Sequence, residues 1–289
     1  MQTQKKKLFK TVATAAVCTC LFGVSTTTLT ANADSEAEKV YYQDTLFHGY
    51  GTMVQDYTYV YCDEVRTETL VIYSGAPSYC NTNSSLTNAC GAISGLNVLV
   101  YYDRHFPNIF PDFEPGMVSA GIYTYFPDMR WDETQAALVD LYNLMQIGTV
   151  GGTTSVNFRN GLATYMGNRG CTTTYSTFYE SETTVNLNTL TTAINAGKVG
   201  VVMCSAYNYI YSMDYSVEDG GEYIVQVNSQ TGHIMMVYGY KTMGYYTDGV
   251  KTDEKTFLLV SSGYGTGEQG YMELEDFSEI DEAWIVNVS

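Results

Sequence analysis

The apolar positions have a helical period between about residues 90 and 195, and they follow a β pattern before this region and after about residue 200. Residues 90–102 are apolar on nearly every side, which predicts a buried central helix. Asp132 opens a capping-box pattern, and the residues after it place leucines on one face, which predicts a second helix. Ser155 is expected to cap a third helix, and residues 187–195 are expected to form a fourth.

Segments rich in β-branched and aromatic residues predict strands on both sides of these helices. The predicted strands cover residues 57–61, 70–73, 199–203, 223–227, 233–240, 256–260, 270–274 and 283–288. Asp248-Gly249 is a turn signal between two of them and predicts an antiparallel hairpin. Helices followed by an antiparallel sheet indicate an α+β fold.

The first 33 residues have the pattern of a secretory signal peptide. A lysine-rich start precedes a small apolar stretch, and Ala31-Asn32-Ala33 forms an A-x-A cleavage site. We therefore expect a secreted, extracellular protein with no membrane anchor after the signal is removed. Residues 34–74 form a strand-rich segment, which is either a pro-segment or part of the sheet domain, and residues 75–289 form the main domain.

The chain is strongly acidic, with a formal net charge of −17. Removing the predicted signal leaves ten Lys and Arg against 31 Asp and Glu, a formal charge of −21. Such a chain repels phosphate backbones, so a nucleic-acid partner is not expected. There is no CxxC or CxxH pair, so the sequence predicts neither a zinc site nor any other metal or cofactor.

Five cysteines lie outside the predicted signal, and because five is odd at least one has no intrachain partner. Cys62 and Cys80 either pair with each other or stay free. Cys204 ends an apolar strand and is expected in the core, and Cys171 is expected at a helix–strand junction. Cys90 stands apart because it heads the predicted central helix between two small residues.

Cys90 and His233 are the residues with the strongest chemical signal. A helix N-terminus carries about half a positive charge, which favours a thiolate at its head. His233 begins a strand-like segment, and an imidazole beside the thiol can take its proton and activate the sulfur as a nucleophile. Of the two other histidines, His48 precedes every predicted helix, and His105 follows the far end of the central one.

Three blocks of the sequence bring together small, aromatic and reactive residues. They are Asn88-Ala89-Cys90-Gly91-Ala92 with its helix, Gly232-His233 heading an apolar strand into Gly239-Tyr240, and Gly263-Tyr264-Gly265 followed by Gly270-Tyr271. In this order they resemble the papain-like cysteine peptidase superfamily, in secreted bacterial branches such as the streptopain-like and bacteriocin-leader-type peptidases. The resemblance covers about residues 79–288.

The resemblance implies a papain-like fold, in which a helical half with the cysteine at the head of its central helix precedes an antiparallel half carrying the histidine. It implies a peptidase that hydrolyses peptide bonds of peptide or protein substrates through a thiolate–imidazolium pair and an acyl-enzyme. Cys90 is then the nucleophile and His233 the general base and acid.

The chain departs from the family pattern at two further positions. The third catalytic residue of the family, usually Asn or Asp, is replaced by serine. Ser261 is the best-aligned candidate to orient the imidazole, and Ser262 is the next. The charged Asp248 and Asp253 are expected in the hairpin loop. The Gln that supplies an oxyanion donor is also absent. Among the residues standing there instead, Asn81, Asn83, Ser84 and Ser85, we expect Asn83 to be the donor.

Two other function classes fit the same residues. A papain-like binding protein with weak or no activity is one, because the family's Asn or Asp and its Gln are missing. An acyl transferase or amidase is the other, since it uses the same Cys–His chemistry with a different acceptor.

Overall fold

The computed structural model describes residues 40–42, 53–73, 76–80, 85–111, 118–120, 123–125, 132–148, 151–216, 220–229, 231–264, 270–274 and 279–289. All of them belong to one compact unit, Lys39–Ser289. The predicted signal peptide, His48 and Asn83 lie outside the described residues.

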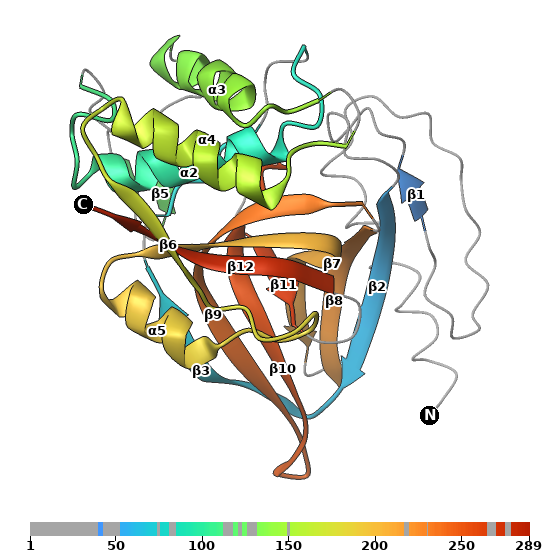
Figure 1. Ribbon diagram of the computed structural model, residues 1–289. Coiled ribbons are helices and arrows are strands. Elements are labelled where there is room, and N and C mark those ends of the chain that lie inside the picture. The colour runs from blue at the N-terminus through green and yellow to red at the C-terminus, as the bar shows by residue number, and fades with distance from the viewer. Residues whose placement is uncertain are drawn as a thin grey trace. The chain divides into compact units, whose positions relative to one another are not determined.

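The protein has an α+β fold in which three helices form a layer over an antiparallel sheet (Figure 1). The helices are α2 (Cys90–Asp103), α3 (Asp132–Leu144), α4 (Ser155–Gly167) and α5 (Leu187–Asn195). Helices α2, α3 and α4 pack on one another, and α2 also packs against the sheet. Helix α5 is separate from this layer and contacts the sheet on its own.

The strands make up most of the rest of the described chain. They are β1 (Val40–Tyr42), β2 (Met53–Tyr61), β3 (Glu64–Ile72), β4 (Val118–Ala120), β5 (Tyr123–Tyr125), β6 (Thr173–Thr177), β7 (Val199–Ser216), β8 (Gly221–Ser229), β9 (His233–Thr247), β10 (Val250–Ser261), β11 (Gly270–Glu273) and β12 (Glu279–Val288). Strands β4 and β5 form a separate pair, and the other ten form one sheet in the order β1-β2-β8-β7-β11-β10-β9-β3, with β12 joining β7 to β6.

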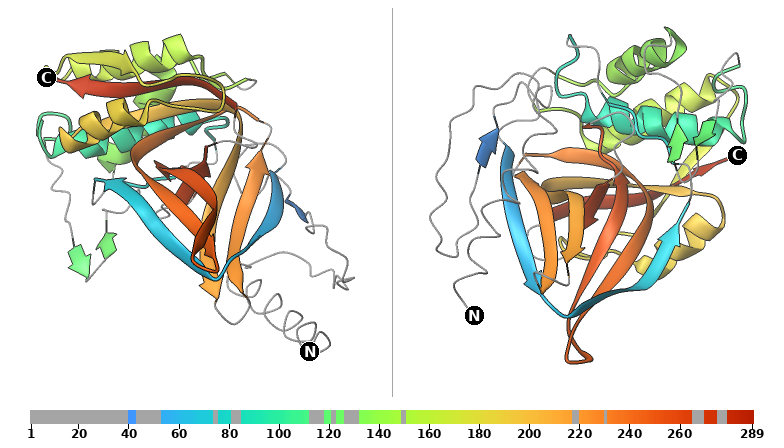
Figure 2. Two further views of the ribbon diagram at one scale, coloured as in Figure 1. Left: turned by 90° about the horizontal axis from the view of Figure 1, so that it is seen from below. Right: turned by 180° about the vertical axis from the view of Figure 1, so that it is seen from behind.

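The sheet closes on itself because the long strand β7 has different partners along its length. Its first part, from Gly200 to Cys204, pairs with β9, and its second part pairs with β11 and β8. Since β9 pairs with β10 and β10 with β11, the four strands β7, β11, β10 and β9 form a closed ring. Figure 2 shows the strands rolled around this ring beneath the helical layer.

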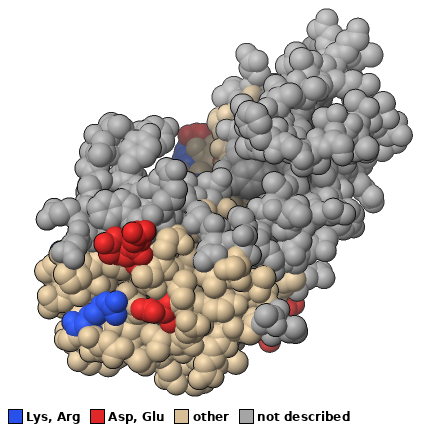
Figure 3. Space-filling view, turned by 90° about the horizontal axis from the view of Figure 1, so that it is seen from above, with Lys and Arg blue, Asp and Glu red and all other residues tan. Residues whose placement is uncertain are grey.

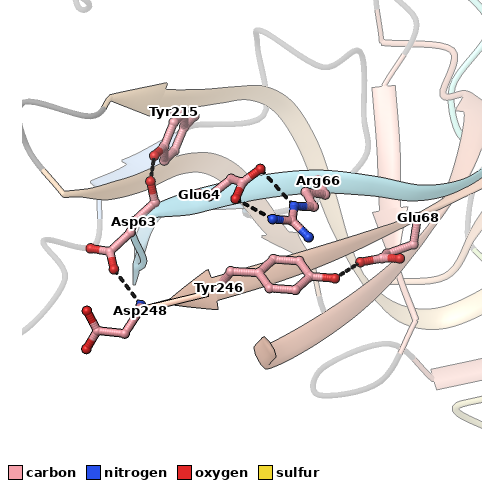
Figure 4. A network of polar contacts seen from close by, with 7 residues as sticks. All are labelled: Asp63, Glu64, Arg66, Glu68, Tyr215, Tyr246 and Asp248. Atoms are coloured by element: carbon pink, nitrogen blue, oxygen red, sulfur yellow. Dashed lines mark hydrogen bonds and ion pairs between the residues drawn. The ribbon is translucent and has the colours of Figure 1, made fainter. Parts of the chain in front are cut away.

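The strand-rich N-terminal segment contributes β2 and β3 to this sheet, at its two sides. Strand β2 pairs with β8 and β3 pairs with β9, and only two residues, Cys62 and Asp63, separate β2 from β3. This corner is fixed by polar contacts (Figure 4): the Asp248 N–H donates to the Asp63 carboxylate at 2.7 Å, and the Tyr215 hydroxyl donates to the Asp63 carbonyl. Residues 53–72 are therefore built into the sheet.

A second set of contacts in Figure 4 ties β3 to β9. The Arg66 guanidinium forms a 2.7 Å ion pair with Glu64 and lies 4.1 Å above the centre of the Tyr246 ring. The Tyr246 hydroxyl donates to Glu68. These side chains are exposed, so the ion pair itself contributes little to stability, and the network mainly fixes the register of the outer strand.

The predicted helices are all present, with one correction at a cap. Every residue of α2 is buried, as its all-apolar sequence predicted, and α5 covers the predicted residues. Helix α4 is capped by Thr154, whose hydroxyl accepts from the Asn157 N–H at 3.2 Å, and Ser155 is instead the first helical residue. Either hydroxyl suits a cap, so the sequence locates the helix start only to within one residue.

Each predicted strand is also present, but most are longer than predicted. Strands β7 and β9 run on through polar and tyrosine-rich residues because both of their edges are paired.

The hairpin between β9 and β10 turns at Asp248 and Gly249, with φ of 52° and 74°. Two consecutive residues in this left-handed region are typical of the type I′ turn that an Asp-Gly sequence favours.

Asp103, the last residue of α2, is a buried carboxyl whose pKa burial raises to about 6, although the Phe110 N–H donates to it at 2.9 Å. Because the pKa of this carboxyl is higher in the folded protein than in the unfolded chain, the fold loses stability as the pH rises from the ordinary pKa of Asp to about 6. We expect Asp103→Asn to increase the free energy of unfolding at pH 7 by on the order of 1–3 kcal/mol, with no gain below about pH 4.

Urea unfolding at pH 4 and pH 7 measures this difference. Asp140→Asn is the control, because Asp140 is exposed on α3 and its carboxylate stays hydrated. An equal effect of Asp103→Asn at the two pH values would contradict the explanation.

The surface of the helical layer carries few charged groups among the residues described. In Figure 3, which looks onto this layer, a few charged side chains lie among uncharged ones in the part that is not grey.

Among the described helices, none is long and apolar enough to cross a membrane.

Candidate functional site

Cys90 is the first residue of α2 and lies at the surface of the helical layer that faces the sheet. It is buried, and Ala89 before it provides no side-chain cap for the helix. The backbone N–H groups of Cys90 and Gly91 lie beside the sulfur. They act to lower the pKa of the thiol, against the larger effect of burial. Asn88 turns the chain into the helix with a φ of 54°, a left-handed conformation that Asn adopts more readily than most residues.

Gly91 is required because the helix head is closely packed. A Cβ atom at this position would lie 2.6 Å from the Thr153 methyl group and 3.6 Å from Ile234. The Thr153 hydroxyl is held by the Met145 carbonyl at 2.8 Å. The small residue after Cys90 thus allows α2 to pack closely against Thr153, just before α4.

His233 is the first residue of β9 and is 1% exposed. Its Nε2 lies 2.8 Å from the carbonyl oxygen of Ser262, in the turn after β10. A carbonyl only accepts, so Nε2 carries the proton and Nδ1 carries the lone pair of the neutral ring. The turn thereby fixes the tautomer in which Nδ1 is the basic atom.

The packing of α2 on β9 places the Cys90 sulfur near the start of β9. The N–H of Ile234, the residue after His233, lies close enough to the Cys90 sulfur to act as a donor to it. Tyr207, whose ring stacks on His233, is near enough to Cys90 that a thiolate would raise the pKa of its phenol. Tyr207 therefore lies near both residues, and a direct contact between the Cys90 sulfur and the His233 imidazole stays a prediction.

Burial shifts both pKa values toward the neutral forms. It raises the pKa of the Cys90 thiol to about 11, against the smaller effect of the backbone donors. It lowers the pKa of His233 to about 4, against the smaller effect of the Ser262 carbonyl. The sequence led us to expect a thiolate–imidazolium pair, whereas these shifts favour a neutral thiol beside a neutral imidazole before substrate binds.

Two tyrosines that the sequence did not single out stack on the imidazole. Tyr207 of β7 stacks on one face, with ring centres 5.1 Å apart and an interplanar angle of 21°. Tyr264 also stacks on the imidazole, at 5.0 Å and 2°. The Tyr207 and Tyr264 hydroxyls contact each other. Among 27 tyrosines neither stands out, although Tyr264 belongs to the third motif block.

The expectation for Ser261 is corrected. Its buried hydroxyl donates to the Pro77 carbonyl at 2.5 Å, and the contact to the imidazole comes from the main chain of Ser262. Strand β10 ends at Ser261, so its side chain points toward the segment before α2 while the next carbonyl points toward His233. Asn83, predicted as an oxyanion donor, lies outside the described residues.

We expect Ser261→Ala to affect stability more than chemistry. Removing the donor from the buried Pro77 carbonyl is expected to lower the free energy of unfolding by about 1–3 kcal/mol. The rate of hydrolysis by the folded fraction is expected to change by less than about threefold, because the imidazole keeps its contact with the Ser262 carbonyl. Such a change is much smaller than the loss of rate expected when a general base is removed. A large loss of rate without loss of stability would show that Ser261 orients His233 after all.

The other predicted groups lie elsewhere. Asp248 is in the hairpin turn as expected, whereas Asp253, also expected in the loop, lies in strand β10. His105 is exposed after the far end of α2. Cys62, Cys90, Cys171 and Cys204 are free thiols, so Cys62 is not paired with Cys80. Within the same residues, no group of three or more His, Cys, Asp or Glu side chains is arranged to hold a metal ion.

Comparison with known proteins provides no family assignment. No family model matches the chain, and no curated protein matches it. The site itself is the basis for the function proposed next.

Proposed function

We propose that the protein is a secreted cysteine peptidase with a papain-like arrangement, in which Cys90 is the nucleophile and His233 the general base and acid. The observation that carries the proposal is the 2.8 Å contact between His233 Nε2 and the Ser262 carbonyl. It leaves Nδ1 as the basic atom, which in this proposal takes the proton of the Cys90 thiol. Cys90 begins the central helix of the helical layer, and His233 begins a strand of the closed β ring, which supports the same proposal.

The neutral pair acts by transferring the proton during attack. The Cys90 sulfur bonds to the peptide carbonyl carbon while its proton passes to His233 Nδ1, and the C=O π electrons move to oxygen. When the C=O bond re-forms, the C–N bond breaks and the imidazolium gives the proton to the leaving nitrogen. The product is an acyl-enzyme and a free amine.

Water completes the cycle through the same imidazole. It gives a proton to Nδ1 as its oxygen attacks the thioester carbon, and collapse of the intermediate breaks the S–C bond. The proton then returns to the sulfur, and the carboxylic acid leaves. General-base help of this kind is worth about 10²- to 10⁴-fold in rate.

The uncapped head of α2 supplies the donors for the developing oxyanion. The N–H groups of Cys90 and Gly91 belong to the first turn, where backbone donors lack partners within the helix. They point toward the sulfur already, so an oxygen on the attacked carbon would lie in the same field. Such donors cost no reorganisation during the reaction.

One observation favours the second candidate, a binding protein with little or no activity. Cys90 and His233 are both buried, and two aromatic rings stack on the imidazole. A substrate must displace part of this cover before its carbonyl meets the sulfur. Slow turnover, or none, is the direct consequence of a cover that stays in place.

Hydrolysis of casein and of a quenched fluorescent peptide library tests the proposal, with and without added hydroxylamine. A peptidase releases new amino termini without it. Product that appears only as hydroxamate would assign acyl transfer instead. No product under either condition, together with no adduct of Cys90 with a peptidyl chloromethyl ketone, would establish the binding protein.

A further inference from the structure

Strand β6 is bonded to the sheet along one edge. Among the described residues, β12 is the only strand that pairs with it. Just before β6, Thr172 and Ser289 exchange both of their N–H to carbonyl bonds, at 2.7 and 3.0 Å. Bonded and non-bonded residues alternate along an antiparallel pair, so Thr173, Tyr175 and Thr177 direct their N–H and carbonyl groups away from β12. These groups form an open edge to which another extended chain can bond.

A cavity lies on each face of β6. Tyr175 and Thr177 line a cavity of about 410 Å³ on the α4 side, together with Arg159 of that helix. Ser176 lines a cavity of about 360 Å³ on the α5 side. Successive side chains of a strand point to opposite faces, and in Figure 1 β6 runs between α4 and α5. A chain paired with this edge would therefore place alternate side chains over the two cavities.

Negative charge gathers at the α4-side cavity. Asp281 and Glu282 of β12 line it, and the Ser205 hydroxyl lies 3.2 Å from the Asp281 carboxylate and 3.3 Å from that of Glu279. Burial raises the pKa of Asp281, and the carboxylates of Glu279 and Glu282 raise it further, against the Ser205 hydroxyl, which lowers it. The three carboxylates thus repel one another, and a cation among them is favoured.

The arginine of this cavity leaves Asp281 unbalanced. The Arg159 guanidinium lies 3.7 Å from Glu282 and 5.0 Å above the Trp284 ring. The Trp284 indole N–H also donates to Glu282, at 3.1 Å. Asp281 is exposed and forms no ion pair with a described residue. Tyrosine rings line the rest of the cavity, and the faces of such rings attract cations.

We propose that the open edge of β6 binds an extended, basic segment of polypeptide, which pairs with the strand and places a Lys or Arg side chain beside Asp281 in the α4-side cavity. The formal net charge of −17 favours the approach of such a segment. The same charge disfavours a second copy of this chain at the edge, because carboxylates would then face carboxylates. The role of the site in selecting protein substrates rests on the proposed function, whereas binding itself does not.

The first test compares two short fluorescent peptides, one alternating Thr with Lys and the other alternating Thr with Gln. Their binding to Cys90→Ala is measured by fluorescence anisotropy, so that no peptide is consumed. We expect the lysine peptide to bind about threefold to tenfold more tightly at low ionic strength, and the difference to shrink in high salt. Equal affinities at low ionic strength would overturn the recognition of charge.

The second test removes one N–H group from the open edge. Tyr175→Pro and Tyr175→Ala both lose the ring, but only proline loses the N–H, and we expect it to bind either peptide at least about tenfold more weakly than alanine does. Thermal unfolding checks the fold of both. If Tyr175→Pro does not fold, Thr173→Pro and Thr173→Ala repeat the comparison at the first residue of the strand, where proline is tolerated. Equal binding by the proline and alanine variants would overturn the pairing.

The third test places the basic side chain. Asp281→Asn is expected to lose most of the preference for the lysine peptide and to keep its affinity for the glutamine peptide within about twofold. Asp140→Asn, at an exposed position on α3, is the control and is expected to keep the preference. An unchanged preference in Asp281→Asn would show that the basic side chain does not enter the α4-side cavity.

The outcomes separate this proposal from the proposed function. Peptide binding without any hydrolysis by wild type would leave the β6 site standing while the peptidase fails. Hydrolysis without binding of either peptide would leave the peptidase standing while the β6 site fails. A dimer in sedimentation velocity that Tyr175→Pro dissociates and Tyr175→Ala does not would assign the edge to a second copy and overturn the proposal.

Discussion

Replacing Cys90 with alanine is expected to reduce peptide hydrolysis by at least about a thousandfold while leaving the fold intact. The nucleophile and its base act as a unit, so losing the sulfur should cost nearly as much as losing the whole pair. Folding should survive because α2 is held by its buried apolar residues, and alanine suits the first turn of a helix. The measurement is kcat/KM on a peptide found by the library screen, with thermal unfolding beside it.

Cys204→Ala is the matched control for this substitution. Cys204 is also free and fully buried, and burial likewise raises the pKa of its thiol. Its sulfur lies 3.8 Å from the Met272 sulfur, inside the core of the β half. Equal loss of activity in the two variants at unchanged stability would remove Cys90 from its assigned role.

Gly239→Ala is expected to destabilise the protein by about 3 kcal/mol or more, the largest stability effect of any single methyl group considered. A Cβ at Gly239 would lie 2.3 Å from the Val71 carbonyl oxygen and 2.9 Å from the Ile72 Cα. Both are backbone atoms of β3, so no side chain can rotate away. Relief requires β3 to separate from β9, with loss of the hydrogen bonds between them.

Urea unfolding measures this effect, and Gly167→Ala is its control. Gly167 ends α4, and a Cβ there meets nothing within 4 Å. The control is expected to be neutral or to stabilise by up to about 1 kcal/mol, as glycine-to-alanine changes do in helices. Similar unfolding free energies for the two variants would mean that β3 is not held as closely to β9 as the structure places it.

The local elements of the fold were predictable because their signals are local. Helix α2 is apolar on every side, and only a fully buried helix satisfies that pattern. The β9–β10 hairpin follows from Asp248-Gly249, whose backbone adopts the required left-handed conformations. The closure of the sheet was not predictable, because it depends on β7 changing partners along its length.

The candidate site was predictable only for residues whose own side chains have the proposed chemical role and stand in a sequence motif. Cys90 and His233 follow from their reactive groups and their positions at the head of a helix and of a strand. The acceptor for His233 is a main-chain carbonyl, which any residue at position 262 would supply, so the side chain of Ser261 was a misleading signal. Tyr207 lies within a tyrosine-rich strand and reaches the site only through sheet closure.

The neutral state of the pair is the least predictable feature, because it depends on burial. A helix head and a neighbouring imidazole both favour a thiolate when the site is open to water. Here burial is the largest cause for both groups, and it moves the thiol and the imidazole in opposite directions away from the ion pair. The proton is therefore expected to move when substrate arrives.

Trapping of the acyl-enzyme tests the central claim most directly. The protein is mixed with an activated ester of a peptide substrate, quenched in acid within the first turnover, and digested for mass spectrometry. We predict that the acyl group is found on Cys90, and that it forms about 10²-fold or more slowly in His233→Gln. An acyl group on any other residue, or none on Cys90 while hydrolysis proceeds, would contradict the account.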